Sequence, residues 1–113
     1  MLERTIKAGK LTPDMTFNQK VWALTSRIPK GKVTTYAAIA RRLNTSAYRA
    51  VGNALNKNPY APAVPCHRVV GSAGQLTGFA GGIPKKKRML EEEGVKFKGD
   101  RVDVSSIYSF DRE

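Results

Sequence analysis

The sequence predicts a mainly helical domain of winged helix-turn-helix character with one small β-hairpin. Two short amphipathic segments, 35–43 and 46–58, follow one another across a tight polar turn, which is the outline of a helix-turn-helix. The glycine-bearing turn 71–74 separates two short segments, 69–70 and 75–76, as a small hairpin does. A length of 113 residues supports one modest hydrophobic core.

The first half of the chain divides into a polar arm and three helices. Residues 1–15 show no strong pattern and are expected to form a loose arm. A helix is predicted over 16–28, starting at Thr16, with apolar residues on one face and the segment 29–32 (PKGK) as its stop. Thr34 or Thr35 suits the cap of the second helix, and Ser46 the cap of the third. The apolar stripes comprise Phe17, Val21, Leu24 and Ile28 on the first helix, and Tyr36, Ile39, Ala40 and Leu43 on the second.

The second half is expected to be less regular. Prolines at 59, 62 and 65 predict an extended segment, because proline also restricts the residue before it. Residues 64–70 read as a short strand, and a final helix is predicted from Pro84 to Glu93, with Gly94 as its C-terminal stop. The expected division is an arm at 1–15, the functional domain at 16–96 and a tail without clear pattern at 97–113.

The charge distribution points to nucleic acid. The net charge is +11, and no acidic residue lies between Asp14 and Glu91, although 13 of the 20 basic residues lie there. A basic surface kept soluble by repulsion is the alternative, but it does not explain why all nine acids lie in the flanks. A basic central segment is what binding to a phosphate backbone requires.

Other classes of protein are disfavoured. No apolar run is long enough to span a bilayer, and the N-terminal residues lack the apolar core of a signal peptide. One cysteine forms no internal disulfide and, with one histidine, no structural zinc site. We therefore expect no membrane association, no metal or other cofactor, and a cytoplasmic protein (nuclear in a eukaryote). No dimerisation helix is evident, so a monomer is expected.

The single cysteine and the single histidine are neighbours, Cys66 and His67, in the segment VPCHRV. A lone cysteine is more often a small buried hydrophobe than a nucleophile. In an extended segment neighbouring side chains point to opposite faces, so contact between the two requires a turn or a bridging water. A hydrolase of the Cys–His type usually takes these residues from distant parts of the chain. A thiolate on a DNA-binding scaffold instead suggests chemistry on an extruded base.

The order of motifs is more specific than any single one. The run RAVGNALNKNP, then VPCHRVV, then GFAGG before a helix with lysines and glutamates resembles the O6-alkylguanine-DNA alkyltransferases, also called methylated-DNA–protein-cysteine methyltransferases. The resemblance covers roughly residues 16–96 and corresponds to the C-terminal DNA-binding and active-site domain. Larger members carry a further N-terminal domain, which is not expected here.

The resemblance implies roles for individual residues. Cys66 is the nucleophile that takes the alkyl group from O6 of guanine, and His67 acts through a water as its base. Glu93 orients His67, and Asn58 braces the turn that leads into the active-site segment. The substrate pocket comprises Val69, whose backbone reads the guanine edge, with Phe79, Ala80, Gly81 and Lys86.

The same resemblance implies how DNA is bound. Tyr36 contacts the flipped nucleotide and Arg49 fills the space that the base vacates. Small residues let the third helix approach the minor groove closely, and they are Ala47, Ala50 and Gly52. The expected partner is double-stranded DNA that contains O6-alkylguanine.

Without the family these residues have plainer interpretations. Tyr36 belongs to an apolar stripe, and Arg49 and Glu93 suit solvated helix positions. Asn58 before Pro59 is a common turn residue.

Two departures from the family are visible. Phe79 and Ala80 stand where tyrosine and serine are common, so Phe79 can stack but cannot donate a hydroxyl hydrogen bond. Backbone N–H groups around Ala80 and Gly81 still suit the leaving oxygen. Tyr48 is larger than the alanine often found beside the intercalating arginine, so the fit to DNA is expected to differ.

Three functions follow in order of preference. The first is an irreversible, single-turnover repair protein that keeps the alkyl group on Cys66. The second is an alkyltransferase-like sensor, which binds O6-alkylguanine without transfer; such proteins often replace the cysteine with tryptophan, whereas Cys66 stands in an intact PCHRV. The third is a helix-turn-helix regulator with an incidental cysteine, which predicts a sequence-specific DNA site.

Overall fold

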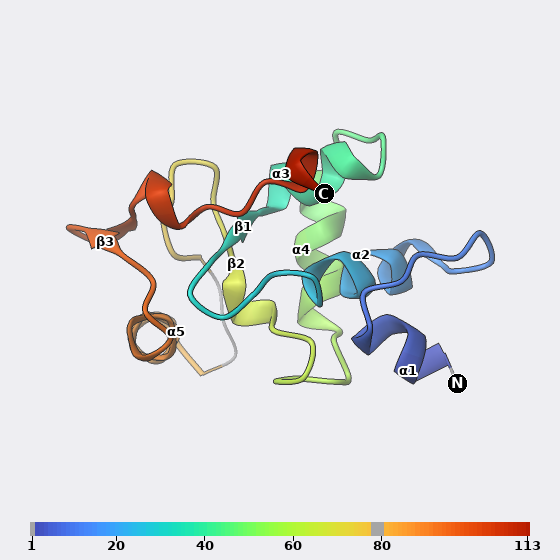
Figure 1. The fold of residues 1–113 in the computed structure, drawn as a ribbon, viewed down its shortest axis with the longest axis horizontal. Coiled ribbons are helices and arrows are strands. Elements are labelled where there is room, and N and C mark those ends of the chain that lie inside the picture. Colours follow the sequence, from blue (N-terminus) through green and yellow to red (C-terminus); the bar gives the residue numbers. More distant parts are fainter. Residues whose placement is uncertain (1, 78–80) are drawn as a thin grey trace.

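The computed structural model describes residues 2–77 and 81–113, and in them five α-helices dominate two minimal sheets (Figure 1). This confirms the predicted mainly helical class. The helices are α1 (Leu2–Lys7), α2 (Phe17–Thr25), α3 (Tyr36–Arg42), α4 (Tyr48–Asn56) and α5 (Ile83–Glu92). The strands are β1 (Thr34–Thr35), β2 (Val69–Val70), β3 (Phe97–Lys98) and β4 (Arg101–Val102). Short 3-10 helices occur at Cys66–Arg68, Val104–Ser106 and Phe110–Arg112.

Helix α2 begins where its capping residues predict. The hydroxyl of Thr16 accepts from the Gln19 N–H at 3.2 Å, and the Gln19 side chain accepts from the Thr16 N–H at 2.9 Å. This reciprocal pair satisfies two N–H groups that have no partner inside the helix. The apolar face of α2 packs against α3 and α4 in the main core, which includes the fully buried Val21 and Leu24.

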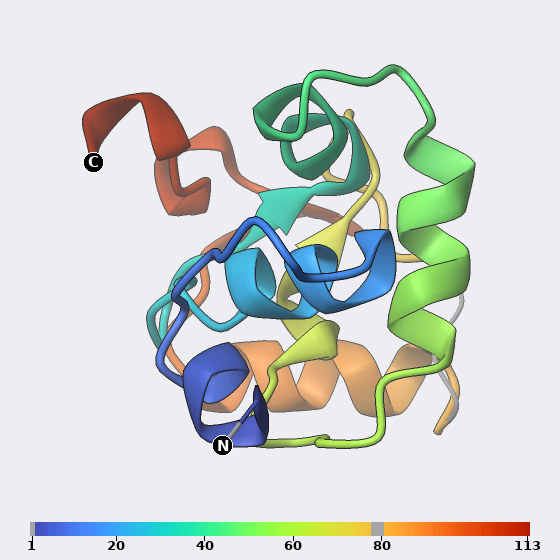
Figure 2. The same cartoon turned by 90° about the vertical axis from the view of Figure 1, so that its right-hand side faces the viewer.

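Helices α3 and α4 form the helix-turn-helix. Thr35 caps α3 by accepting from the Ala38 N–H at 3.0 Å, one of the two residues predicted for this role. Ser46 does not cap α4: the N-cap is Ala47, which offers no side-chain acceptor. The hydroxyl of Thr45 instead accepts from the Ala47 N–H at 3.1 Å, which closes the turn just before the helix. In Figure 2, α4 stands upright along one side, with α5 below.

The predicted hairpin is wrong in position. β2 pairs in parallel with β1, in the register Thr34 with Val69, and the segment after it closes as a tight loop in which the Gly71 N–H donates to the Gln75 carbonyl at 2.9 Å. The antiparallel hairpin is β3–β4, in the tail where no element was predicted. Instead of extending along β2, the segment after the turn forms an isolated bridge from Gln75 to Arg101 of β4.

The proline-rich segment is not extended as predicted. It forms consecutive turns, with the Val64 N–H donating to the Tyr60 carbonyl at 3.1 Å. Residues 66–68 are a 3-10 turn rather than a strand, and only Val69–Val70 are extended. The reason is visible in the Asn58 side chain, which bonds to the backbone at both ends of the segment and folds it back.

The two ends of the described chain are packed, so residues 2–15 are not a loose arm. Ile6 of α1 is fully buried, and Met15 lies in the same cluster beneath α2. Arg27 joins the ends, because its Nε donates to the Gly9 carbonyl at 2.8 Å while its Nη1 pairs with Glu113. Phe110 of the tail lies in the main core.

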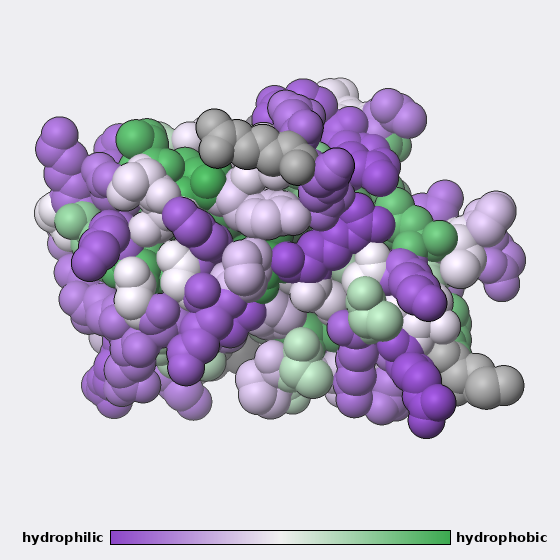
Figure 3. Space-filling model, viewed as in Figure 1, coloured by the Kyte–Doolittle hydropathy of each residue, from purple (hydrophilic) through white to green (hydrophobic). Residues whose placement is uncertain are grey.

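Hydrophilic side chains dominate the face shown in Figure 3, interrupted by small apolar patches. Among the described residues, no helix is long and apolar enough to cross a membrane.

Candidate active site

Cys66 and His67 share one 3-10 turn that enters β2. The Cys66 N–H donates to the Val64 carbonyl at 2.9 Å, and the Arg68 N–H donates to the Pro65 carbonyl at 2.9 Å. The turn leaves Cys66 partly exposed and buries His67, which is 3% exposed. Cys66 therefore lies nearer the surface than the imidazole, which is in the protein interior.

The Glu93 carboxylate binds two side chains of the 3-10 turn. It follows α5 as the C-cap residue, and its Oε2 lies 3.0 Å from Nε2 of His67. The same carboxylate accepts two hydrogen bonds from Arg68, from Nε and Nη2, each at 2.9 Å. Arg68 also donates to the Ile28 carbonyl at 2.8 Å. This bond connects the 3-10 turn to the segment that follows α2. Sequence reasoning missed this role of Arg68, and only its place two residues after Cys66 hinted at it.

These contacts set the protonation of the pair. Burial lowers the pKa of His67 below its ordinary 6.5, and the hydrogen bond that His67 donates to Glu93 only partly opposes this effect. Partial burial raises the pKa of Glu93, but hydrogen bonds from Arg68 and His67 outweigh it and leave that pKa lowered. At neutral pH a neutral imidazole thus donates from Nε2 to an ionised carboxylate. Its Nδ1 keeps a free lone pair and can accept a proton.

Asn58 joins the end of α4 to the active turn. Its Nδ2 donates to the Val64 carbonyl at 2.9 Å, and its Oδ1 accepts from the Tyr60 N–H at 2.9 Å. Val64 is fully buried and lies two residues before Cys66. The predicted bracing contact is thus present in the geometry.

Lys86 is a buried cation beside the site. Its side chain is 1% exposed, and Nζ donates to the carbonyls of Val69 at 2.7 Å and Thr77 at 3.2 Å. Burial lowers the pKa of Lys86 to about 8, and interaction with Cys66 opposes the shift. Lys86 therefore joins α5 to β2 and to the residue that precedes the glycine-rich loop.

Tyr36 meets Thr77 at the same place. Their hydroxyl oxygens are 2.7 Å apart, and Tyr36 is close enough to Cys66 for the two groups to interact electrostatically. Burial raises the pKa of Tyr36, and the hydrogen bond to Thr77 partly opposes this. Tyr36 is thus part of the cluster around Cys66 rather than only a core residue. Thr77 was not predicted, and nothing in the sequence distinguishes it from other turn residues.

The remaining predicted residues lie apart from this cluster or outside the description. Arg49 and Ala47 are exposed at the start of α4, and Tyr48 between them is 53% exposed. Gly52, one turn later, faces Tyr36, because a Cβ built there lies 4.0 Å from its ring. Ala50 is half-buried on the same helix. Phe79 and Ala80 lie outside the described residues, whereas Gly81 is exposed.

The arrangement offers an accessible thiol, a buried neutral base and a carboxylate that fixes the tautomer of that base. In the described ranges no three histidine, cysteine or acidic side chains gather as metal ligands. The site is suited to nucleophilic attack by sulfur.

Comparisons with known proteins agree with this chemistry. Residues 16–95 match the model of the family "6-O-methylguanine DNA methyltransferase, DNA binding domain". A methylated-DNA–protein-cysteine methyltransferase of Methanosarcina mazei is 50% identical over 79% of this chain and 58% of its own length. One from Mycobacterium tuberculosis is 45% identical over 74% of this chain and 52% of its own length. The chain thus spans little more than half the length of these relatives.

Solved structures show the same likeness. The M. tuberculosis OGT in complex with DNA superposes with a TM-score of 0.68 at 40% identity, covering 82% of this chain and 63% of that one. The S. pombe Atl1, in complex with damaged DNA containing O6-carboxymethylguanine, gives a TM-score of 0.72 at 31% identity, covering 82% of this chain and 94% of that one.

Proposed function

The chain belongs to the 6-O-methylguanine DNA methyltransferase family, and from this premise we propose that it reverses DNA damage by moving the alkyl group of O6-alkylguanine irreversibly to Cys66. The protein acts as a monomer on double-stranded DNA and requires no cofactor. Each molecule is consumed by one lesion, because the thioether formed on sulfur is a poor leaving group.

One observation carries the proposal: the partly exposed Cys66 shares one 3-10 turn with His67, a buried imidazole that is hydrogen-bonded to Glu93. A lone cysteine without such a base is only a few per cent thiolate at neutral pH. The lowered pKa of His67 keeps its Nδ1 unprotonated and able to take the thiol proton.

The proposed step balances as a substitution at carbon. Nδ1 of His67 accepts the Cys66 proton through a water, and the sulfur attacks the alkyl carbon bonded to O6. The S–C bond forms as the C–O bond breaks, and the electron pair passes to the guanine oxygen. Protonation of the ring then restores ordinary guanine, and Cys66 remains as the thioether.

The residues of the pocket have matching roles. Val69 presents its backbone to the guanine edge, and Lys86 holds its carbonyl at 2.7 Å. Backbone N–H groups near Gly81, with Ala80 before it, serve the leaving oxygen, and Phe79 stacks on the base.

Binding of DNA is proposed to use the minor groove. The exposed Arg49 at the start of α4 takes the place of the extruded base, and Tyr36 contacts the flipped nucleotide. The small side chains of Ala47, Ala50 and Gly52 let α4 lie close to the duplex.

A damage sensor is the second candidate, because the chain covers 94% of Atl1, a protein crystallised with damaged DNA. This function requires the same binding surface but no transfer. The intact Cys66–His67–Glu93 geometry favours transfer over sensing.

The deciding experiment is intact mass after incubation with duplex DNA that contains one O6-methylguanine. We expect the wild type to gain about 14 Da, at most once per molecule, and Cys66→Ser to gain nothing. Tight damage-selective binding without a mass gain would identify a sensor instead.

A further inference from the structure

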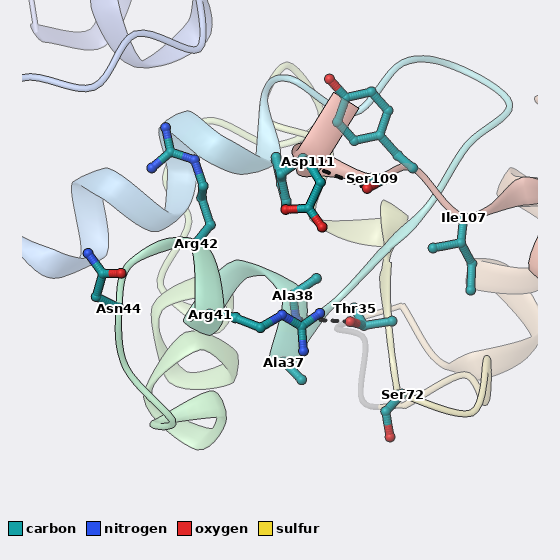
Figure 4. A pocket seen from close by; sticks show the side chains of 12 residues that line it. Thr35, Ala37, Ala38, Arg41, Arg42, Asn44, Ser72, Ile107, Ser109 and Asp111 are labelled. Atoms are coloured by element: carbon teal, nitrogen blue, oxygen red, sulfur yellow. Dashed lines mark hydrogen bonds between the residues drawn. The ribbon is translucent and has the colours of Figure 1, made fainter. Parts of the chain in front are cut away.

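A groove away from Cys66 runs between α3 and the C-terminal segment 107–111 (Figure 4). Its volume is about 700 Å³, and Ala37, Ala38, Ile107 and Phe110 give it an apolar lining. Polar and charged side chains also line it, and they are Thr35, Arg41, Arg42, Asn44, Ser72, Ser109 and Asp111. None of the residues assigned to transfer lies in it.

Two arginine side chains on the α3 wall of the groove have no hydrogen-bond or ion-pair partner within the described chain. Arg41 and Arg42 occupy the last turn of α3, both are exposed, and within the described chain no hydrogen bond or ion pair engages either guanidinium. In Figure 4 the two side chains leave α3 in different directions, with Ser72 below Arg41 and Asp111 on the opposite wall. Two unpaired guanidinium groups against one carboxylate give this groove a net positive charge that suits an anion.

The groove also continues the surface assigned to DNA. Thr35 lines it and directly precedes Tyr36, whereas Asn44 lies in the turn between the two helices of the helix-turn-helix. Arg41 lies five positions after Tyr36, which corresponds to about 7.5 Å along the α3 axis and about 140° around it. That axial distance is comparable to two nucleotide steps of about 3.4 Å each along the duplex axis.

We propose that this groove binds the phosphate backbone of the duplex beside the lesion, with Arg41 as the principal phosphate contact and Arg42 as a second. The inference rests on the proposed function, because it assumes that DNA lies along α3 and α4. It adds a contact that reads no base and lengthens the footprint on one side of the damaged nucleotide.

The test is the salt dependence of binding to a duplex with one O6-methylguanine, measured by fluorescence anisotropy. All variants carry Cys66→Ser, so that binding is not followed by transfer. Each lost phosphate contact is expected to reduce the slope of log K against log salt concentration by about 0.9. Arg41→Ala should therefore show this reduction, Arg41→Lys should keep most of the slope, and Asp111→Asn should strengthen binding.

Arg4→Ala is the matched control, because Arg4 is an exposed arginine on α1, which lies on the lower side of the molecule in both views, whereas α3 lies on the upper side. Equal slopes for Arg4→Ala and the double variant Arg41→Ala/Arg42→Ala would overturn the proposal and leave an acidic protein partner as the groove's occupant. A duplex shortened on the side of the groove should remove the effect of Arg41→Ala.

Intact mass separates this inference from the proposed function. Loss of transfer in the wild type itself would contradict the proposed function, whereas the salt slopes would still decide whether the groove binds DNA.

Discussion

Glu93 connects two side chains of opposite chemical roles through one carboxylate. Towards His67 it accepts a hydrogen bond that fixes the tautomer, and towards Arg68 it forms a two-point ion pair that fixes its own position. The guanidinium therefore keeps Glu93 ionised, and the ionised carboxylate keeps the lone pair of His67 on Nδ1. Arg68 is therefore a positioning residue, which acts on the thiol indirectly through Glu93 and His67.

The pH profile of transfer follows from the buried base. Because the pKa of His67 lies below 6.5, the neutral form of His67 predominates at pH 6.5, and the transfer rate should fall further as the pH drops through the lowered pKa. The unfolded state, with its ordinary pKa of 6.5, binds the proton more readily, so stability also falls as the pH drops below that value. The rate of single-turnover transfer, measured as the pH is lowered through and below 6.5, tests this prediction.

The control for this profile is Glu93→Gln, which keeps an acceptor for Nε2 but removes the charge. Because the carboxylate opposes the lowering of the His67 pKa, its loss should move the acid limb to still lower pH and slow transfer. An acid limb at or above 6.5 in the wild type would contradict the role of His67 as a buried neutral base.

At the scale of elements, the bend between α4 and β2 depends on one side chain. Asn58 pairs with backbone groups of Tyr60 and Val64, so it adds two hydrogen bonds to those that the turns make among themselves. This contact carries the position of α4 to the turn that holds Cys66.

Asn58→Ala should lower the free energy of unfolding by about 1–3 kcal/mol, because two hydrogen bonds worth about 0.5–1.5 kcal/mol each are lost, although the Val64 carbonyl still accepts from the Cys66 N–H. Transfer should slow as well, since the 3-10 turn loses its anchor. Urea denaturation and single-turnover transfer measure the two effects. Asn53→Ala, an exposed position on α4, is the control and should change neither. Slow transfer with unchanged stability would mean that Asn58 contacts the substrate instead.

Local signals in the sequence predicted α2 to α5 because their information is local, whereas α1 lies in the segment expected to be a loose arm. Thr16 with Gln19, and Thr35 before α3, define helix starts within four residues. The β1–β2 pair was not predictable in this way, because it joins residues 34–35 with 69–70 and two-residue strands carry no periodicity. The hairpin was therefore assigned to the nearest turn instead of to β3–β4.

In the candidate site, too, local sequence signals reveal some residues, whereas other contacts depend on the folded structure. Cys66 and His67 were visible as neighbours, but their pairing with Glu93 came from the family and not from spacing, since 26 residues separate the histidine from it. The contacts of Arg68 and Thr77 depend on side-chain directions that emerge only when α5 packs beneath the turn.

At the scale of the whole molecule, the C-terminal segment packs against earlier parts of the described chain. A parallel bridge joins Val33 to Ile107, and Glu113 accepts from Arg27 and Tyr108. Phe110 packs edge-on to Tyr108 at 5.5 Å between ring centres. The tail predicted to be without pattern thus forms one wall of the arginine-lined groove and part of the main core.

Phe110→Ala tests whether this tail folds together with α2–α4. Phe110 is 9% exposed in the main core, so removal of its ring should lower the free energy of unfolding by about 3 kcal/mol. Val104→Ala, which is 79% exposed in the same tail, should change it by less than about 0.5 kcal/mol. Urea denaturation measures both. Equal, small effects would show that the tail opens independently, and the groove between α3 and residues 107–111 would then lack a fixed wall. A large effect for Phe110→Ala alone, in one cooperative transition, would mean that the groove is as stable as the core that holds Cys66 in place.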